Sequence, residues 1–375
     1  MSGAPIARPG VMHVAVDATA LASGWSGIPK YTDRLVRQLQ RHPDVELTLL
    51  ANTSRRHFSR IDGVREVAAH RPGSGMWRNL FVRRWVARER PDVYWAPEMV
   101  LPHHVAAPTV VTVHDLTPLT MAHTKSLRAQ LGFRALGDSV RHATRVIAVS
   151  DWTRRQIERV LGVAGDHVTV VGNGVDEQFR PGDRAAARST VRDRWQLDHS
   201  FVLVVGTLER RKGLEVLFDA ARLAATRGAP WPLVLAGAVG DRGAELAATA
   251  DALPGCHRLG PVTDDELLSL YRAADVVAAP SLAEGFGIVP LEAMACGTPV
   301  VVAGQSGALE EIAGSAAIVV GSRTAAAWAD GLDAARHDRE RLVRAGTELA
   351  ARYRWSSAAD QTLAVLRAAA ATGGG

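Results

Sequence analysis

Short apolar runs alternate with stretches of helical spacing along the first half of the chain. Stretches 28–40 and 150–161 have the apolar spacing of amphipathic helices, and Ser150 is expected to cap the second one. The apolar runs are rich in Val and Ile and end in polar or glycine residues, which predicts buried strands at 11–21, 45–51, 92–97, 109–116, 144–150 and 167–175.

The second half repeats this scheme, with helices expected at 212–228 and 263–275. Strands are predicted at 201–208, 232–239, 256–262, 275–281, 298–304 and 316–320. Two successive series of strand and helix predict an α/β chain with two doubly wound, mostly parallel sheets. Gly, Asn and Pro cluster in "GNGVDEQFRPGD", so we place one domain at 1–175 and the other at 176–375. The last helix is the one element that we allow to pack back on the first domain.

Length and composition agree with an intracellular enzyme. A chain of 375 residues is too long for one ordinary core and suits two domains. No run of eighteen apolar residues occurs, and the first residues lack an apolar secretory segment. Cys256 and Cys296 are the only cysteines, which argues against a disulfide framework or a zinc site and fits a reducing compartment. We therefore expect a cytoplasmic protein.

Charge is distributed unevenly between the two halves. Residues 1–175 hold 23 Lys and Arg against 14 Asp and Glu, a net of +9, whereas the remainder holds 21 against 25, a net of −4. A basic half can attract a phosphorylated substrate or an anionic lipid surface, or it can simply be solvated. We expect no nucleic-acid partner.

The stretch 77–91 bears on the membrane question, because it carries Trp77, Phe81 and Trp85 at helical spacing with arginines between them. Such a helix either rests on an anionic membrane or packs its aromatic side chains on a sheet and solvates its arginines. The spacing favours packing. Peripheral contact with the inner face of the membrane remains the second interpretation.

The stretch "EGFGIVPLE" at 284–292 carries the most specific chemistry. It follows a predicted strand, and ligands of doubly wound sheets bind beyond the carboxyl ends of strands. Pro290 suits the first residue of a helix, and Gly297 suits its left-handed end. Backbone N–H groups at the helix start would bind an anion, while Glu284 and Glu292 would accept hydrogen bonds from hydroxyl groups. A phosphate between two sugars satisfies all three features; the other interpretation is a capped helix beside a solvated loop glutamate.

Several segments of the chain resemble, in order, the retaining glycosyltransferases of family four. "EGFGIVPLEAMACGTPVV" is similar to their two-glutamate signature. The other similar segments are "SGIPKY", "VTVHDLTPL", "RVIAVSDWTRRQI", "VVGNGVDEQF", "VVGTLERRKGLEVLFDA" and "RLGPVTDDELLSLYRAADVVAAPS". The resemblance implies the GT-B fold, in which two Rossmann-like domains face each other across a cleft. The first domain would bind the acceptor and the second the nucleotide sugar.

The resemblance also assigns roles to residues. Arg211 and Lys212 would stabilise the leaving nucleoside diphosphate, Glu284 would hold the donor sugar, and His114 would lie beside the reacting centre. Glu292 would hold the ribose, and Gly27 would let the diphosphate approach the first domain. The expected donor-binding set is Gly27, Thr207, Arg211, Lys212, Val262, Glu284, Phe286, Gly287, Ile288 and Glu292.

Three features depart from the family pattern or limit the mechanism. Thr207 stands where many members have an arginine, for which Arg210 would compensate, and Pro29 follows Ile28 where a glycine is common. No Asp-x-Asp triplet occurs, so we expect metal-independent transfer without a cofactor, and no metal site at His103 and His104.

The expected activity is that of a hexosyltransferase acting in polysaccharide biosynthesis. It would use a nucleotide sugar, with GDP-mannose the first candidate, and a glycan, lipid-linked or small-molecule acceptor. Three other classes stay open: a sugar-nucleotide epimerase, a phosphorylase and a non-catalytic scaffold on the same fold. A dinucleotide-dependent oxidoreductase is disfavoured, because no G-x-G-x-x-G follows the first strand.

Overall fold

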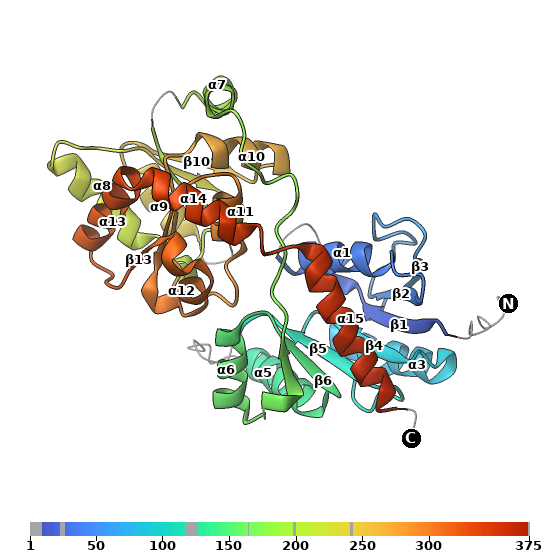
Figure 1. Cartoon of the computed structure of the whole chain (residues 1–375). Coiled ribbons are helices and arrows are strands. Elements are labelled where there is room, and N and C mark those ends of the chain that lie inside the picture. Colours follow the sequence, from blue (N-terminus) through green and yellow to red (C-terminus); the bar gives the residue numbers. More distant parts are fainter. Residues whose placement is uncertain are drawn as a thin grey trace. The chain divides into compact units, whose positions relative to one another are not determined.

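The computed structural model describes residues 10–22, 27–116, 127–163, 165–197, 200–240 and 243–373. The chain forms two compact units, Met1–Gly174 with Trp355–Gly375 and Val175–Arg354. Each contains a parallel sheet with helices packed against it (Figure 1). The predicted α/β class with two doubly wound sheets is confirmed.

The first unit contains a seven-stranded sheet in the order β3-β2-β1-β4-β5-β6-β7. Its central strands are almost wholly buried, as expected for a parallel sheet that is covered on both faces. The sequence missed β3, whose residues are all only partly buried. The strands are β1 (Met12–Asp17), β2 (Val45–Ala51), β3 (Arg65–Ala68), β4 (Val93–Ala96), β5 (Thr109–Val113), β6 (Arg145–Ala148) and β7 (Val168–Val170).

The helices predicted at 28–40 and 150–161 are confirmed as α1 and α6, whereas α5 was not predicted. The Ser150 hydroxyl accepts a hydrogen bond from the backbone N–H of Thr153 at 3.0 Å, so the predicted cap of α6 is confirmed. The last helix, α15, packs on α1 and on strands β4, β5 and β6 of this unit. The helices are η1 (Thr19–Ala22), α1 (Gly27–Leu39), α2 (Ser74–Met76), η2 (Trp77–Val82), α3 (Arg83–Glu89), α5 (Leu127–His142), α6 (Asp151–Leu161), η3 (Gly165–His167) and α15 (Trp355–Ala371).

The second unit contains a six-stranded sheet in the order β10-β9-β8-β11-β12-β13. The strands are β8 (Val202–Val205), β9 (Leu233–Ala236), β10 (Cys256–Gly260), β11 (Val276–Ala279), β12 (Val300–Ala303) and β13 (Ile318–Val320). The helices are α7 (Arg184–Trp195), η4 (Arg210–Lys212), α8 (Glu215–Thr226), α9 (Ala244–Asp251), α10 (Asp264–Ala273), α11 (Ile288–Ala295), η5 (Gly304–Ser306), α12 (Ala308–Ala313), η6 (Gly314–Ala316), α13 (Ala325–His337) and α14 (Arg339–Ala350).

Both sheets reverse their strand order at one point, between β1 and β4 in the first unit and between β8 and β11 in the second. Connections on either side of such a point leave in opposite directions, so a crevice opens beyond the carboxyl ends of the two strands. Residues that directly follow β8 and β11 are therefore expected to meet. The motif residues Lys212 and Glu284 follow these two strands.

The aromatic stretch 77–91 forms η2, a π-helical turn, followed by α3. Trp77 and Trp85 are buried in the core of the first unit, so the packing interpretation is confirmed. Arg78 is an exception to the expected solvated arginines, because it is buried and pairs with Asp17 at 3.0 Å. Within the described ranges, no helix combines the length and apolar character that crossing a membrane requires.

Candidate active site

The ends of β8 and β11 bring the two parts of the predicted donor site together. Arg211 and Lys212 lie in η4 just beyond β8, and Glu284 lies five residues beyond β11. The backbone N–H of Leu282 donates a hydrogen bond to the Arg211 carbonyl at 2.7 Å, which joins the two loops. A small cavity of about 70 Å³ lies here, between Lys212, Glu284 and the start of α11.

Glu284 is the centre of this arrangement. Lys212 Nζ pairs with Glu284 Oε1, and Arg211 Nη1 lies 3.4 Å from Oε2. The Ser281 hydroxyl donates a third hydrogen bond to Oε1 at 2.8 Å. Burial alone would raise the pKa of Glu284, but Lys212 and then Arg211 outweigh it and hold that pKa below its usual value. Glu284 is thus ionised and neutralises charge on both predicted phosphate-binding side chains.

Close approach of the two loops requires glycine at one position. Gly213 ends η4 with φ +61°, and a Cβ atom there would lie 2.5 Å from the Pro280 carbonyl oxygen. Arg323 donates to this same carbonyl at 3.0 Å and also contacts the Gly213 carbonyl. Substitution of Gly213 would separate the basic pair from Glu284.

The start of α11 differs by two residues from the expectation. The helix begins at Ile288, which makes Pro290 its third residue and not its first. The first turn still needs no N–H from this position, so proline fits without loss of a hydrogen bond. Gly287 precedes the helix with φ +101°, and a Cβ there would lie 2.5 Å from Leu309 Cδ2. Gly297 follows the helix with φ +77°, which confirms the predicted left-handed end.

Glu292 was expected in the first turn of α11, but the structure places it one residue beyond that turn. It is the fifth helical residue and is only 3% exposed. The Tyr271 hydroxyl donates a hydrogen bond to Glu292 Oε2 at 2.9 Å. Burial, together with the Glu292 charge, raises the Tyr271 pKa well above its usual value. The sequence gave no sign of this partner, which comes from α10.

The other expected donor residues lie on loops around the same edge of the second sheet. Thr207 follows β8, Val262 links β10 to α10 and is half-buried, and Phe286 is buried with its ring 5.7 Å from that of Tyr353. Arg210 pairs with the exposed Glu245 at 3.3 Å and not with Glu284. Arg210 thus does not contact Glu284 as Arg211 and Lys212 do, and its part in the clamp stays a prediction.

In the first unit, His114 lies directly after β5 at the carboxyl edge of the sheet. Its Nε2 lies 3.0 Å from the Pro97 carbonyl oxygen, and its ring packs edge-on against Tyr31 at 4.7 Å between centroids. Burial lowers the pKa of His114 to about 4, although the Pro97 carbonyl and Asp115 act in the opposite direction. His114 is therefore a neutral side chain near pH 7.

Gly27 was expected in a loop stiffened by Pro29, but it begins α1 instead. Pro29 is the third residue of this helix, where its fixed φ is favourable and its missing N–H costs nothing. A Cβ atom on Gly27 would meet no atom within 4 Å. Among the residues of the first unit that the structure describes, none therefore requires glycine at this position.

Comparisons with known proteins agree with this geometry. Residues 25–179 match the family model described as "Glycosyltransferase Family 4", and residues 189–351 match "Glycosyl transferases group 1". The D-inositol 3-phosphate glycosyltransferases of Mycobacterium tuberculosis (strain H37Rv) and Mycobacterium bovis (strain AF2122/97) are each 32% identical over 332 residues. The match covers 82% of this chain, and the chain spans 64% of the length of these relatives.

Solved structures with a similar fold have lower sequence identity. Anabaena Alr3699/HepE in complex with UDP and glucose has a TM-score of 0.73 at 20% identity and covers 95% of this chain and 99% of its own. Sucrose-phosphate synthase from Thermosynechococcus elongatus has a TM-score of 0.77 at 20% identity, with 96% and 100% covered. These neighbours support the GT-B fold. Because the two family models together span most of the chain in the expected order, it belongs to the glycosyltransferases of the group 1, family 4 type.

Proposed function

We propose that the chain is a retaining, metal-independent hexosyltransferase. It moves a hexose from a nucleoside diphosphate sugar to a hydroxyl group of an acceptor. The observation that carries the proposal is the contact of Lys212 and Arg211 with Glu284 at the point where β8 and β11 end. Two cations, a carboxylate and a helix start there supply groups for a diphosphate and for sugar hydroxyls.

The contact implies an exchange of partners when donor binds. The diphosphate takes the place of the Glu284 carboxylate on Lys212 and Arg211, and Glu284 then accepts hydrogen bonds from hydroxyls of the transferred sugar. As the bond to the anomeric carbon breaks, negative charge grows on the leaving phosphate, where two fixed cations stabilise it. The acceptor hydroxyl attacks the same face of an oxocarbenium-like sugar, so configuration is retained.

The donor base and sugar are assigned by analogy. The segments "VHDLTPL" and "GTLERRKG" resemble those of bacterial mannosyl-, rhamnosyl- and glucosyltransferases, which makes GDP-mannose the first candidate, whereas the HepE structures contain UDP, glucose or UDP-glucose. Thermal-shift measurements with GDP, UDP and TDP separate these donors, because a ligand that binds only the folded chain raises its melting temperature. The matching sugar nucleotides are then tested for release of nucleoside diphosphate. Failure of all three nucleotides to bind would contradict the proposal.

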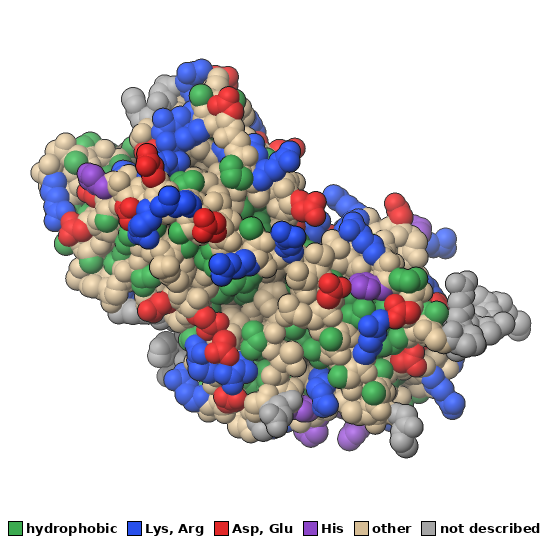
Figure 2. Space-filling model, in the orientation of Figure 1, with side chains coloured by type: hydrophobic (Ala, Val, Ile, Leu, Met, Phe, Trp, Pro, Cys, Tyr) green, Lys and Arg blue, Asp and Glu red, His purple; other side chains and the backbone are tan. Residues whose placement is uncertain are grey.

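A second proposal concerns the membrane. Met76 and Leu80 are 49% and 42% exposed, and exposed arginines of α3, including Arg84 and Arg88, line a cavity of about 290 Å³ with Leu80. Apolar and cationic side chains on one face suit an anionic lipid surface. On the face drawn in Figure 2, basic and acidic side chains are intermixed. Sedimentation with phosphatidylglycerol vesicles tests this contact, and loss of binding in Leu80→Glu is expected.

A further inference from the structure

His114 lies at the carboxyl edge of the first sheet, directly after β5. β5 pairs with β4, and the strand order of this sheet reverses between β4 and β1. Ligands of doubly wound sheets bind at this edge, beside the point of reversal. His114 is half-buried, which leaves part of its surface for a ligand in this crevice.

The hydrogen on the His114 ring can be assigned from its partner. Nε2 lies 3.0 Å from the Pro97 carbonyl oxygen. A carbonyl oxygen only accepts hydrogen bonds, so Nε2 carries the hydrogen and donates it. Burial lowers the pKa of His114 to about 4, so the ring carries no second proton near pH 7. Nδ1 therefore has a lone pair and can only accept a hydrogen bond, and among the described residues none donates one to it.

The Pro97 carbonyl is fixed by the residues on both sides of it. Ala96 is the last residue of β4. The Glu98 carboxyl group accepts a hydrogen bond from Arg78 at 2.9 Å, and the same guanidinium pairs with Asp17 at the end of β1 at 3.0 Å. Arg78 and Asp17 are both buried. The acceptor of the Nε2 hydrogen is thus tied to the ends of two strands.

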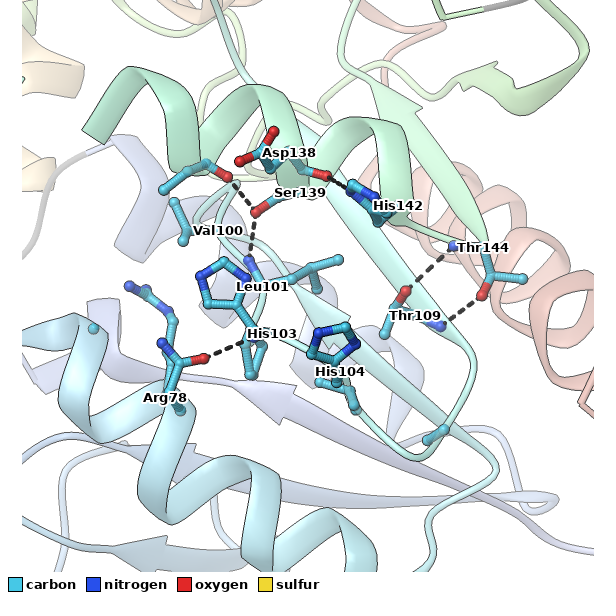
Figure 3. Close-up of a pocket in the computed structure, with 16 residues that line it drawn as sticks. Arg78, Val100, Leu101, His103, His104, Thr109, Asp138, Ser139, His142 and Thr144 are labelled. Atoms are coloured by element: carbon cyan, nitrogen blue, oxygen red, sulfur yellow. Dashed lines mark hydrogen bonds between the residues drawn. The ribbon is translucent and has the colours of Figure 1, made fainter. Parts of the chain in front are cut away.

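The segment that joins β4 to β5 is also held beyond Pro97. The Leu101 N–H donates to the Ser139 hydroxyl of α5 at 2.9 Å (Figure 3). Met99 is left-handed with φ +70°, a conformation that costs energy and persists only where surrounding contacts impose it. Its Sδ accepts a hydrogen bond from the His114 N–H at 3.4 Å. The ring and the backbone of His114 are therefore both held by one preformed segment.

Tyr31 of α1 holds the His114 ring as well. The two rings pack edge to face, with 4.7 Å between centroids and 89° between planes, which is a favourable geometry for aromatic rings. Tyr31 is 2% exposed, and its hydroxyl lies 3.3 Å from Thr112 Oγ1, which also accepts a hydrogen bond from Trp95 Nε1 at 3.0 Å. A turn of the His114 ring by 180° would place a carbon at the Pro97 carbonyl and lose that hydrogen bond. The ring is thus held in one orientation.

We propose that Tyr31 and the Pro97 carbonyl hold His114 as an obligate hydrogen-bond acceptor, whose Nδ1 receives a sugar hydroxyl group of one of the two transfer substrates. Tyr31 is then a positioning residue that acts through His114. The inference rests on the proposed hexosyl transfer and specifies one contact in it. Because the Nε2 hydrogen stays on the Pro97 carbonyl, His114 donates no proton to the leaving phosphate.

Long-range proton–nitrogen NMR on the full chain with ¹⁵N-labelled histidine, without substrates, tests the state of the ring. His114→Gln identifies the signals of His114. Near pH 7 the wild type and Tyr31→Phe should carry a slowly exchanging hydrogen on Nε2 and none on Nδ1. Tyr31→Leu removes the ring contact and should speed this exchange about fivefold or more. A hydrogen on Nδ1 of the wild type, or unchanged exchange in Tyr31→Leu, would overturn the inference.

Kinetics separate positioning from a general loss of structure. Release of nucleoside diphosphate from the sugar nucleotide is followed with methyl hexosides and D-inositol 3-phosphate as probe acceptors. Tyr31→Leu should lower kcat/KM about tenfold, the effect of one impaired hydrogen bond, with the dissociation constant of the nucleoside diphosphate unchanged. Tyr31→Phe keeps the ring and should stay within about threefold of the wild type.

Trp85→Leu is the matched control for this measurement. Trp85 is also buried and packs edge-on against a histidine of the same unit, His13, with 6.2 Å between centroids. We expect kcat/KM of this variant to remain near that of the wild type. Equal losses in Trp85→Leu and Tyr31→Leu would mean that Tyr31 only supports the core, which would overturn its positioning role.

Substrate analogues identify the hydroxyl group and the substrate that carries it. Fluorine donates no hydrogen bond, so replacing the contacted hydroxyl by fluorine should reduce kcat/KM at least as much as replacing it by hydrogen. Both series are made in the donor hexose and in the accepted probe, and in His114→Ala the loss at that position should disappear. Absence of any loss that depends on His114 would refute the contact. Failure of the proposed transfer would show instead as wild-type protein that binds no nucleoside diphosphate.

Discussion

Replacing Glu284 with Gln should strengthen binding of the bare product nucleotide while it impairs transfer. The carboxylate occupies Lys212 and Arg211, so a diphosphate must displace it before it can bind these cations. Glutamine keeps the shape and can still accept the hydrogen bond from Ser281, but it carries no charge. If Glu284 only held the donor sugar, as the family resemblance implies, its replacement would leave the affinity for the bare nucleotide unchanged. The ion pairs predict an increase.

The expected size of the gain in nucleotide affinity follows from the burial of the Lys212–Glu284 ion pair. Lys212 and Glu284 are 17% and 18% exposed, so their attraction is less screened than that of a surface pair. Hydrogen bonds between charged groups contribute about 1.5–3 kcal/mol. Hydration of the released carboxylate offsets part of this, so we expect about 1.4 kcal/mol, which is a tenfold lower dissociation constant.

Isothermal titration calorimetry with the product nucleoside diphosphate measures this change. Glu209→Gln is the matched control, since Glu209 pairs with the same Arg211 at 3.2 Å but is 38% exposed. An exposed pair contributes about 0–1 kcal/mol, so the control should change affinity by less than about fivefold. Unchanged or weaker nucleotide binding in folded Glu284→Gln would refute the partner exchange.

Other expected outcomes concern the clamp, the metal, the ribose and pH. Lys212→Ala should lower turnover by about a hundredfold, because the charge acts mainly on the transition state; near-normal turnover in the folded variant would remove Lys212 from the mechanism. EDTA should leave the rate intact, and a complete loss restored by magnesium would defeat metal-independent transfer. Glu292→Gln should weaken binding of the nucleoside diphosphate itself. Unchanged affinity would mean that Glu292 only accepts the hydrogen bond from the Tyr271 hydroxyl and does not hold the ribose. The lowered pKa of His114 means that the native state binds fewer protons than the unfolded state between about pH 6.5 and 4. The free energy of unfolding should therefore decrease as the pH is lowered through this window, and this decrease should be smaller in His114→Gln.

Strand and helix positions could be predicted because parallel strands buried on both faces leave unbroken Val and Ile runs. β3 escaped detection, since "REVA" has only partly buried residues and charged side chains at two of its four positions. The start of α11 was placed two residues late because proline was assumed to be the first helical residue, whereas it is tolerated throughout the first turn.

Candidate site residues were found where a motif is continuous in sequence, and missed where partners lie far apart. Glu284 and Lys212 were both selected, but 72 residues separate them, and nothing in either segment indicates an ion pair. The Tyr271 partner of Glu292 comes from a different helix. A cavity of about 590 Å³ between η2, α5 and the segment that joins β4 to β5 was not predicted, because its lining comes from three segments that are far apart in the sequence.

The most direct measurement follows the anomeric proton by NMR while the chain acts on the sugar nucleotide whose base gives the largest thermal shift. The account predicts that nucleoside diphosphate and a new glycosidic linkage form together, that the linkage has the anomeric configuration of the donor, and that Lys212→Ala slows both signals equally. A product of inverted configuration, or an epimerised sugar nucleotide with no linkage formed, would contradict it.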